Sequence, residues 1–415
     1  FKGVFKAFIL RSSAKAFFNM IVPRLLGVLA LGKNAQAFWV SQTRHSSAPR
    51  YIPTPSQLAA ASTADEFPWS LPDGTIDASQ VPKGFQSGFV SIVGFPNVGK
   101  STLMNALVGD RLSIATNKEQ TTRHRVMGVV TTQSYQLIYS DTPGILDPQY
   151  KLHEEMMASV RLALGDADVL LAVVDASAPP PPMSVELTPK GLESTPRAAE
   201  NEDVMVTTLR QATNQRVVIA LNKMDLLEGG LEGPGGDGAE SRDAAADGEA
   251  AKALAARWRQ LVPSAESVVC VCAQSGQGLD ALLAEMVAAL PEAPPCFSAD
   301  VLTDKPERFF ASEMVREAIF EQFGQEVPYS CEVAIKSFKQ SPKILKIEAH
   351  INVDRDSQKG ILIGKKGAAI KKLGIAARES LERFFNKKVH LELSVQVKKG
   401  WRQSELDLKS FGYGA

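Results

Sequence analysis

The residues with the clearest chemical potential form a glycine-rich loop between an apolar stretch and a helical pattern. The loop reads Gly94-Phe95-Pro96-Asn97-Val98-Gly99-Lys100-Ser101, which is the spacing G-x-x-x-x-G-K-S, and it follows the strand-like run 89–93. Such loops point backbone N–H groups at phosphate oxygens, at the positive end of the helix that follows. We therefore expect Lys100 to reach the β- and γ-phosphates of a nucleotide and the Ser101 hydroxyl to bind Mg²⁺.

A second motif indicates which base is bound. Asn222-Lys223-Met224-Asp225 follows the apolar stretch 217–221. The Asp225 carboxylate can accept hydrogen bonds from N1–H and the exocyclic amino group of guanine, a donor pair that adenine does not present. Because the wrong base leaves polar groups unpaired, GTP is expected to be preferred over ATP. Cys272-Ala273-Gln274, after an expected strand at 267–271, is a weaker candidate for another guanine-contacting loop.

Two segments between these motifs are expected to sense the γ-phosphate. Asp141-Thr142-Pro143-Gly144 follows an expected strand at 136–140, so Asp141 can hold Mg²⁺ through water and the Gly144 amide is free to meet the γ-phosphate. The upstream run Gln120-Thr121-Thr122-Arg123 supplies a threonine hydroxyl for the metal, in a loop that orders with GTP. Thr122 is favoured, and Thr121 stays open as the alternative.

These motifs define the expected nucleotide site. The predicted catalytic groups are Lys100, Thr122 and Gly144, and the predicted metal ligands are Ser101, Thr122 and Asp141. The full set expected to contact GTP is Gly94, Asn97, Val98, Gly99, Lys100, Ser101, Thr102, Asp141, Gly144, Asn222, Lys223, Asp225, Cys272, Ala273 and Gln274.

The C-terminal third has the element order of a KH domain of the bacterial type. The pattern predicts a helix, two strands, two helices and a strand, at 306–323, 330–338, 344–353, 358–363, 368–385 and 388–397. The two later helices flank the turn Gly364-Lys365-Lys366-Gly367, whose glycines let phosphates approach the backbone. Residues 359–399 contain eleven basic and three acidic residues, which suits an RNA partner.

The predicted RNA contacts surround this turn. Ile361, together with Leu362 and Ile363, is expected to form an apolar floor for bases. The predicted RNA-binding residues are Ile361, Gly364, Lys365, Lys366, Gly367, Lys371 and Lys372.

Taken together, the order and spacing of these motifs resemble Era, the ribosome-assembly GTPase of bacteria and organelles, within the TrmE-Era-EngA-YihA-septin-like GTPases. The resemblance spans about 88–413 and is broken by two insertions. It implies an α/β fold, a doubly wound P-loop GTPase sheet, followed by an α+β type II KH domain. It also implies a monomer in which GTP docks the KH domain on small-subunit ribosomal RNA near its 3′ end, and hydrolysis releases the protein from the assembling small subunit.

The resemblance carries a mechanistic consequence. Ile145 stands where Ras-like switches place a glutamine, as in Era-type GTPases, so its side chain cannot orient the attacking water and hydrolysis by the chain alone is expected to be slow. Asn97 stands where potassium-dependent relatives of Era hold their cation. An asparagine in such a loop is equally well explained as a turn residue, so K⁺ joins Mg²⁺ only as an open alternative.

Composition limits the remaining possibilities. The chain has 415 residues, 44% of them hydrophobic, and no formal net charge, which suits two folded domains and a tail. Residues 1–64 contain eight Lys or Arg and no Asp or Glu, as organellar transit peptides do. A mitochondrial matrix location is predicted, with the plastid stroma as the alternative because 25–37 resembles a signal core with a cleavage site. Arg24 and Lys33 interrupt the apolar run well short of the ~20 residues that a membrane span needs.

The expected domain boundaries follow from these segments. A transit peptide covers 1–64, linkers cover 65–85 and 291–305, a GTPase domain covers 86–290, a KH domain covers 306–399 and a tail covers 400–415. The insertions 176–203 and 228–250 are expected to be disordered surface loops. The four cysteines lack the spacing of a zinc site or a disulfide framework.

Two rival functions remain. One is a GTPase acting on transfer-RNA modification or on membranes, which would have no need of a KH domain. The other is an RNA-binding module with a decayed GTPase, against which the motif residues Lys100, Ser101, Asp141 and Asp225 are all intact.

Overall fold

The computed structural model describes residues 67–71, 74–180, 198–212, 214–227 and 248–414. The expected transit peptide and most of the two expected insertions lie outside these residues. The last residues of each insertion already belong to helices, because α4 begins at Ala198 and α5 begins at Glu249.

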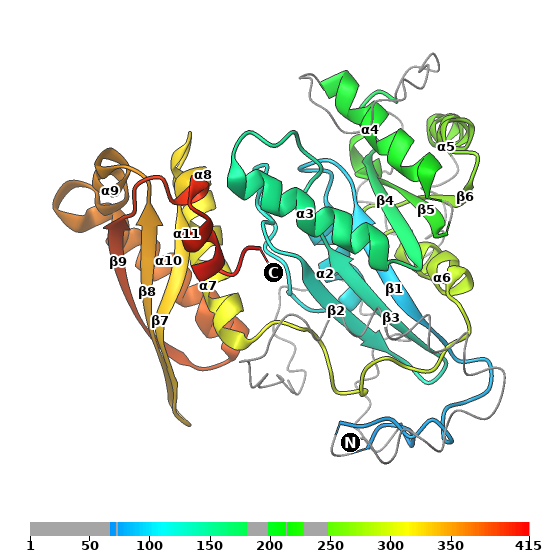
Figure 1. Cartoon of the computed structure of the whole chain (residues 1–415), viewed down its shortest axis with the longest axis horizontal. Helices are drawn as coiled ribbons and strands as arrows, with labels where there is room; N and C mark the ends of the chain where they lie inside the picture. The colour runs from blue at the N-terminus through cyan, green and yellow to red at the C-terminus, as the bar shows by residue number, and fades with distance from the viewer. Residues whose placement is uncertain (1–66, 72–73, 181–197, 213, 228–247, 415) are drawn as a thin grey trace, which may run out of the picture. The chain divides into compact units, whose positions relative to one another are not determined.

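A six-stranded sheet forms the centre of the first domain (Figure 1). Its order is β2-β3-β1-β4-β5-β6, and β2 is antiparallel to β3 whereas the other neighbours are parallel. The parallel strands bring their carboxyl ends to one edge, where α/β proteins bind their ligands. The strands are β1 Gln86–Val93, β2 Val126–Thr131, β3 Tyr135–Asp141, β4 Val169–Asp175, β5 Arg216–Asn222 and β6 Ala265–Cys270.

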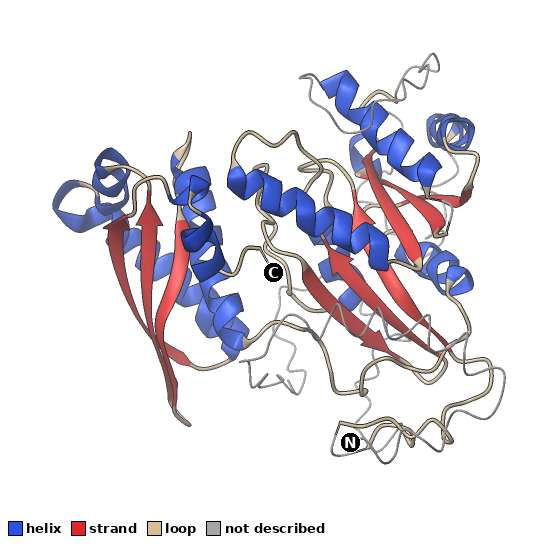
Figure 2. Ribbon diagram, in the orientation of Figure 1, coloured by secondary structure: helices blue, strands red, loops and turns tan. Residues whose placement is uncertain are grey.

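Helices cover both faces of this sheet, which explains the nearly continuous apolar strands (Figure 2). One core packs Leu103 and Met104 of α2 and Leu282 and Met286 of α6 on the sheet. The other core includes Leu209 of α4 and Trp258 of α5. The helices are α2 Lys100–Val108, α3 Lys151–Asp166, α4 Ala198–Gln211, α5 Glu249–Leu261 and α6 Leu279–Ala289. The predicted doubly wound α/β domain is therefore confirmed.

The second domain has a three-stranded sheet of order β7-β8-β9, with β7 antiparallel and β9 parallel to β8. Its core packs α7 and α10 against this sheet. The predicted KH element order is confirmed, and β8, α10 and β9 have the predicted limits. The elements are α7 Glu307–Gln322, α8 Val327–Ser330, β7 Glu332–Gln340, β8 Ile344–Val353, α9 Asp356–Ile363, α10 Ala368–Phe385 and β9 Lys388–Val397.

The short helix α8 was not predicted, and the expected start of the first KH strand at residue 330 is wrong. Pro328 lies in the first turn of α8, where its missing N–H costs nothing. The chain becomes extended only at Cys331, so β7 begins at Glu332.

Both segments expected as linkers make defined contacts. Leu302 and Thr303 extend the open edge of β2, where Val129 N donates to Leu302 O at 2.8 Å and Thr303 Oγ1 donates to Met127 O at 2.6 Å. These bonds occupy backbone groups that an exposed edge strand would otherwise leave unpaired. Within 65–85, Phe67, Trp69 and Phe85 form a small buried aromatic cluster.

The segment 400–415, expected as a tail, contains a short 3-10 turn at Trp401–Gln403 and the helix α11 Glu405–Ser410. Trp401, Leu408 and Tyr413 are buried in one cluster with Leu152 and Met156 of α3. The end of the described chain is thus anchored on the helix that follows Asp141-Thr142-Pro143-Gly144. Among the described helices, none has the length and apolarity needed to cross a bilayer.

Candidate functional site

The phosphate loop connects β1 to α2 at the carboxyl edge of the sheet. Gly99 has φ 95°, and a Cβ there would lie 2.3 Å from Asn222 Nδ2, so only glycine fits this position. Asn97 also has a positive φ, 64°, which asparagine tolerates better than most residues. Thr102 lies in the first turn of α2, directly after Lys100 and Ser101.

The Lys100 side chain is hydrogen-bonded to the backbone of the phosphate loop. Its side chain is buried, and Nζ donates to Gly94 O at 3.1 Å and to Phe95 O at 2.7 Å. Burial lowers the pKa of Lys100 to about 8, although the attraction of Asp141 opposes that shift. A phosphate placed beside this ammonium would raise the pKa of Lys100 again, because a nearby negative charge stabilises the protonated form.

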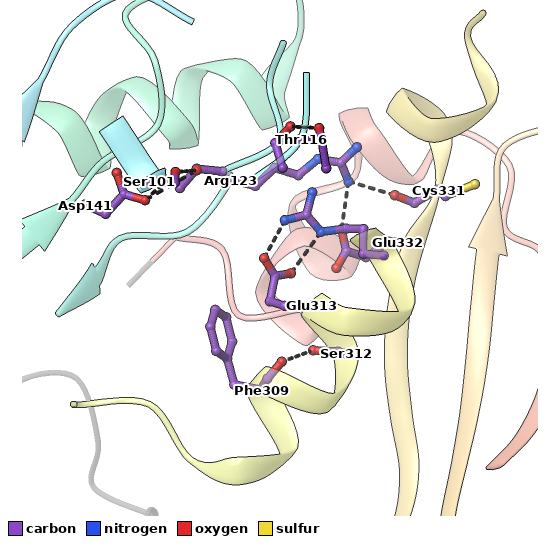
Figure 3. Close-up of polar contacts among 12 residues, drawn as sticks. Ser101, Thr116, Arg123, Asp141, Phe309, Ser312, Glu313, Cys331 and Glu332 are labelled. Atoms are coloured by element: carbon purple, nitrogen blue, oxygen red, sulfur yellow. Dashed lines mark hydrogen bonds and ion pairs between the residues drawn. The ribbon is translucent and has the colours of Figure 1, made fainter. Parts of the chain in front are cut away.

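Three oxygen-bearing side chains, those of Ser101, Thr122 and Asp141, meet at the start of α2, and Figure 3 shows the contact between Ser101 and Asp141. Ser101 Oγ donates to Asp141 Oδ2 at 2.8 Å and lies 2.8 Å from Thr122 Oγ1. Asp141 is fully buried, burial raises its pKa, and its other oxygen, Oδ1, has no hydrogen-bond partner. Two hydroxyls and an unpaired carboxylate oxygen are the hard donors that Mg²⁺ prefers, so these residues fit that ion.

The two candidate threonines have different surroundings. Thr121 Oγ1 donates to Lys118 O at 2.7 Å and lies 2.6 Å from Thr116 Oγ1, so it is already bonded within its own loop. Thr122 Oγ1 is the hydroxyl that lies beside Ser101. The geometry therefore favours Thr122 as the residue of this loop that faces the site.

The Asp141-Thr142-Pro143-Gly144 segment passes directly beside the phosphate loop. Ile145 N donates to Gly94 O at 3.1 Å, and Thr142 Oγ1 donates to Ile92 O at 2.8 Å. Gly144 lies between these two anchored residues. The Ile145 side chain packs in the apolar cluster of α3 and the C-terminal segment.

Asn222 connects the phosphate loop to the third predicted loop. Its Nδ2 donates to Val98 O at 2.9 Å, and its Oδ1 accepts from Ala273 N at 2.9 Å. Asp225 is exposed, and its Oδ1 accepts a hydrogen bond from Cys272 Sγ at 3.0 Å. Gln274 is exposed beside them. The three segments that the sequence proposed as guanine-nucleotide contacts therefore lie together.

One residue near this site was missed by the sequence reasoning. Asp175 ends β4 and pairs in register with Asn222, and its Oδ2 lies 2.7 Å from Lys223 Nζ. Lys223 has φ 62° and lies two residues before Asp225. The available signal was an acidic residue at the end of an apolar strand, the same pattern that identified Asp141.

The expected RNA contacts surround the turn between α9 and α10. A Cβ on Gly364 would lie 2.6 Å from the Cβ of Ala369, so glycine allows the close approach of the two helices. Lys365, Lys366, Lys371 and Lys372 are exposed, and Gly367 precedes α10.

Only one of the three residues expected to form the apolar floor is exposed. Ile361 is 49% exposed, whereas Leu362 is fully buried in the KH core and Ile363 is partly buried against it. The expectation for Leu362 is wrong, because successive helical residues point about 100° apart and cannot share a face. Ile375 of α10, which was not predicted, is 44% exposed.

Comparisons with family models match both domains. Residues 89–223 match a model described as a 50S ribosome-binding GTPase, and residues 326–402 match a KH domain model.

Similar proteins cover most of the chain. A chloroplastic GTPase Era-like protein of Oryza sativa is 40% identical over 331 residues, which are 79% of this chain and 70% of that protein. GTPase Era of Rippkaea orientalis is 37% identical over 332 residues, which are 80% of this chain and 94% of that protein.

Solved structures agree with these relatives. An Era bound to MgGDPNP and nucleotides 1506–1542 of 16S ribosomal RNA has a TM-score of 0.67 and 34% identity, covering 80% of this chain and 100% of that one. The Aquifex aeolicus Era bound to GDP and AlF4⁻ has the same values. With its phosphate loop, base-reading motif and KH domain in this order, the chain belongs to the Era family of GTPases.

Proposed function

We propose that this Era GTPase binds GTP with Mg²⁺, hydrolyses it to GDP and phosphate, and binds the 3′ region of small-subunit ribosomal RNA during assembly of that subunit. The observation that carries the proposal is the meeting of Ser101, Thr122 and Asp141 beside Lys100, in a chain that also carries an exposed KH turn. The similar Era bound to MgGDPNP and 16S ribosomal RNA supports both halves of it.

Each polar group has a distinct part in the proposed reaction. Lys100 binds the β- and γ-phosphates, and the amide of Gly144 meets the γ-phosphate. Ser101 and Thr122 would hold Mg²⁺, with Asp141 acting through water, and the bound ion would supply positive charge to the phosphate oxygens. Because these donors are fixed before the reaction, they stabilise the transition state without reorganising.

Positioning of the attacking water has a different origin. The Ile145 side chain is apolar and packs away in the cluster around α3. The water is therefore held by backbone groups, a bridging water or a monovalent cation, for which Asn97 is our candidate ligand. Equal turnover in KCl and NaCl would remove K⁺ from the proposal.

The relatives support a proposal for the cellular location. Similar proteins of rice, maize and Arabidopsis thaliana are chloroplastic. They favour the plastid stroma, the alternative in the composition argument, over the mitochondrial matrix. Detection in isolated plastids of the source cell, and absence from its mitochondria, is the expected result, and the reverse distribution would contradict it.

The central test is phosphate release by the purified chain, with and without an RNA oligonucleotide that carries the 3′ end of small-subunit ribosomal RNA. We expect the RNA to change turnover, and Lys100→Ala to lower it about 10²- to 10³-fold through loss of a phosphate-binding cation. Lys83→Ala, an exposed lysine outside the site, is the control. GTP turnover that ignores this RNA would leave a GTPase with a non-ribosomal RNA client.

Guanine selection is tested by Asp225→Asn. The substitution replaces two acceptors by an amide that can donate, so it suits xanthine, which has a carbonyl oxygen in place of the guanine amino group. We expect the affinity for GTP to fall ~100-fold, from hydrogen bonds to a charged group that are each worth about 1.5 kcal/mol or more, and the affinity for XTP to rise. Competition binding measures both affinities. Unchanged discrimination between the two nucleotides would exclude Asp225 as the base-reading residue.

The KH turn is tested by the double change Lys365→Ala/Lys366→Ala. Removing two phosphate contacts should weaken RNA binding and reduce the slope of log K against log salt by ~1.4, since each contact on a single strand contributes about 0.7. Lys339→Ala/Lys343→Ala is the matched control, because this pair lies at the β7–β8 hairpin and not at the turn between α9 and α10. A salt slope that changes equally in both double variants would argue against a specific role of the turn.

A further inference from the structure

Arg123 lies one residue after Thr122 but has no part in the nucleotide site. Its side chain extends into the KH domain and is 2% exposed (Figure 3). The backbone that presents a hydroxyl to Ser101 and Asp141 therefore continues directly into a buried interdomain contact. Neighbouring Cα atoms are about 3.8 Å apart, so one residue cannot leave its position without disturbing the next.

The guanidinium of Arg123 donates hydrogen bonds to four acceptors of the KH domain. Nη1 donates to Cys331 O at 2.7 Å and to Glu332 Oε2 at 3.0 Å. Nη2 donates to Pro328 O at 3.2 Å and to Tyr329 O at 3.0 Å. Three of these acceptors are backbone carbonyls at the end of α8, where carbonyls lack the next helical turn, and Pro328 O also accepts a longer bond from Cys331 N at 3.5 Å. A planar, forked donor can meet this arrangement, and a single ammonium cannot.

The fourth acceptor, Glu332, is a buried carboxylate that depends on this contact. It is 4% exposed, burial raises its pKa, and its Oε2 accepts hydrogen bonds from both Arg123 and the Tyr413 hydroxyl, the latter at 2.8 Å. Withdrawal of Arg123 would remove the guanidinium that pairs directly with this buried carboxyl group and leave Arg316 as the cation near it, which is unfavourable in the protein interior. The Arg123–Glu332 contact therefore favours the arrangement in which the loop that carries Thr122 stays docked on the KH domain.

The next residue strengthens the same connection. The His124 ring stacks on Tyr413 at 4.2 Å with 17° between the planes, and it meets Phe309 edge-on at 5.5 Å. Lys118 of the same loop donates to the carbonyls of Phe320 and Phe323 at the end of α7.

We infer that Arg123 is the residue that couples nucleotide binding at Thr122 to the position of the KH domain, and so to RNA. The inference rests on the proposed function, in which Thr122 joins Mg²⁺ and GTP and the KH domain binds RNA. RNA that stabilises the docked KH domain then holds Arg123, and with it Thr122, in the arrangement that binds GTP. By linkage, RNA raises GTP affinity by the same factor as GTP raises RNA affinity.

The test measures the affinity of the full chain for a non-hydrolysable GTP analogue, with and without a saturating RNA oligonucleotide of the small-subunit ribosomal RNA 3′ end. The ratio of the two affinities is the coupling. For the unaltered chain we expect a ratio of about 10, within the usual allosteric range. For Arg123→Lys, which keeps the charge but loses the fork, we expect a ratio within about twofold of one. The affinities measured with each ligand alone should change less than about threefold, since other interdomain contacts remain.

Arg125→Lys is the matched control. Arg125 lies two residues later in the same segment, but it bonds only within the GTPase domain, from Nε to Ser140 Oγ at 2.6 Å and from Nη1 to Asp166 Oδ2 at 2.8 Å. It should keep the coupling ratio of the unaltered chain. If Arg123→Lys does not fold, the double change Arg123→Gln/Glu332→Gln removes the pair without leaving a buried charge, and it should also reduce the ratio to near one.

The outcomes separate the two hypotheses. A ratio near one in the unaltered chain overturns the proposed switch itself. A ratio near 10 that persists in both Arg123 variants overturns only the role of Arg123. The same conclusion follows if Arg125→Lys loses as much coupling as the Arg123 variants do. Loss of the ratio in the Arg123 variants alone supports the coupling role, because a merely structural contribution would shift thermal stability without changing the ratio.

Discussion

The contact of Ser101 with Thr122 and Asp141 is the interaction on which the rest of the functional architecture depends. The three side chains come from the start of α2, the loop before β2 and the end of β3. They meet because parallel strands end at one edge of the sheet and the loops that follow converge there. Oδ1 of Asp141 is buried without a hydrogen-bond partner, which suits a carboxylate that faces a bound cation.

The position of Thr122 then determines where its neighbours lie. Arg123 and His124 reach the KH domain and the C-terminal segment, and Trp401 donates from Nε1 to Ser330 O at 3.1 Å beside them. The C-terminal segment in turn packs on α3, which follows the Asp141-Thr142-Pro143-Gly144 segment. The loop that carries Thr122 therefore contacts the KH domain, and Ile145, directly after Gly144, packs in the cluster of the C-terminal segment. Since buried charges must stay paired, such an interface favours discrete arrangements over gradual ones.

Much of this could be predicted from the sequence because the signals are local. The phosphate loop, the strand-terminal Asp141 and the KH elements β8, α10 and β9 all follow from short-range spacing and periodicity. The sequence favoured Thr122 as the metal-binding threonine but could not exclude Thr121. Only the fold shows that the Thr121 hydroxyl is already bonded within its own loop. The pairing of Arg123 with Glu332 joins residues 209 positions apart, so no local pattern contains it. Leu362 was misplaced because a run of apolar residues on a short helix does not show which one faces the core.

The most direct measurement of the central claim is amide hydrogen exchange in two segments, 119–125 of the nucleotide-sensing loop and 328–333 of the KH domain. The protein would be compared with Mg²⁺ and a non-hydrolysable GTP analogue, and with GDP. The account predicts that exchange in both segments slows together with the GTP analogue and accelerates together with GDP. Protection of 119–125 by the GTP analogue with an unchanged exchange rate in 328–333 would contradict it.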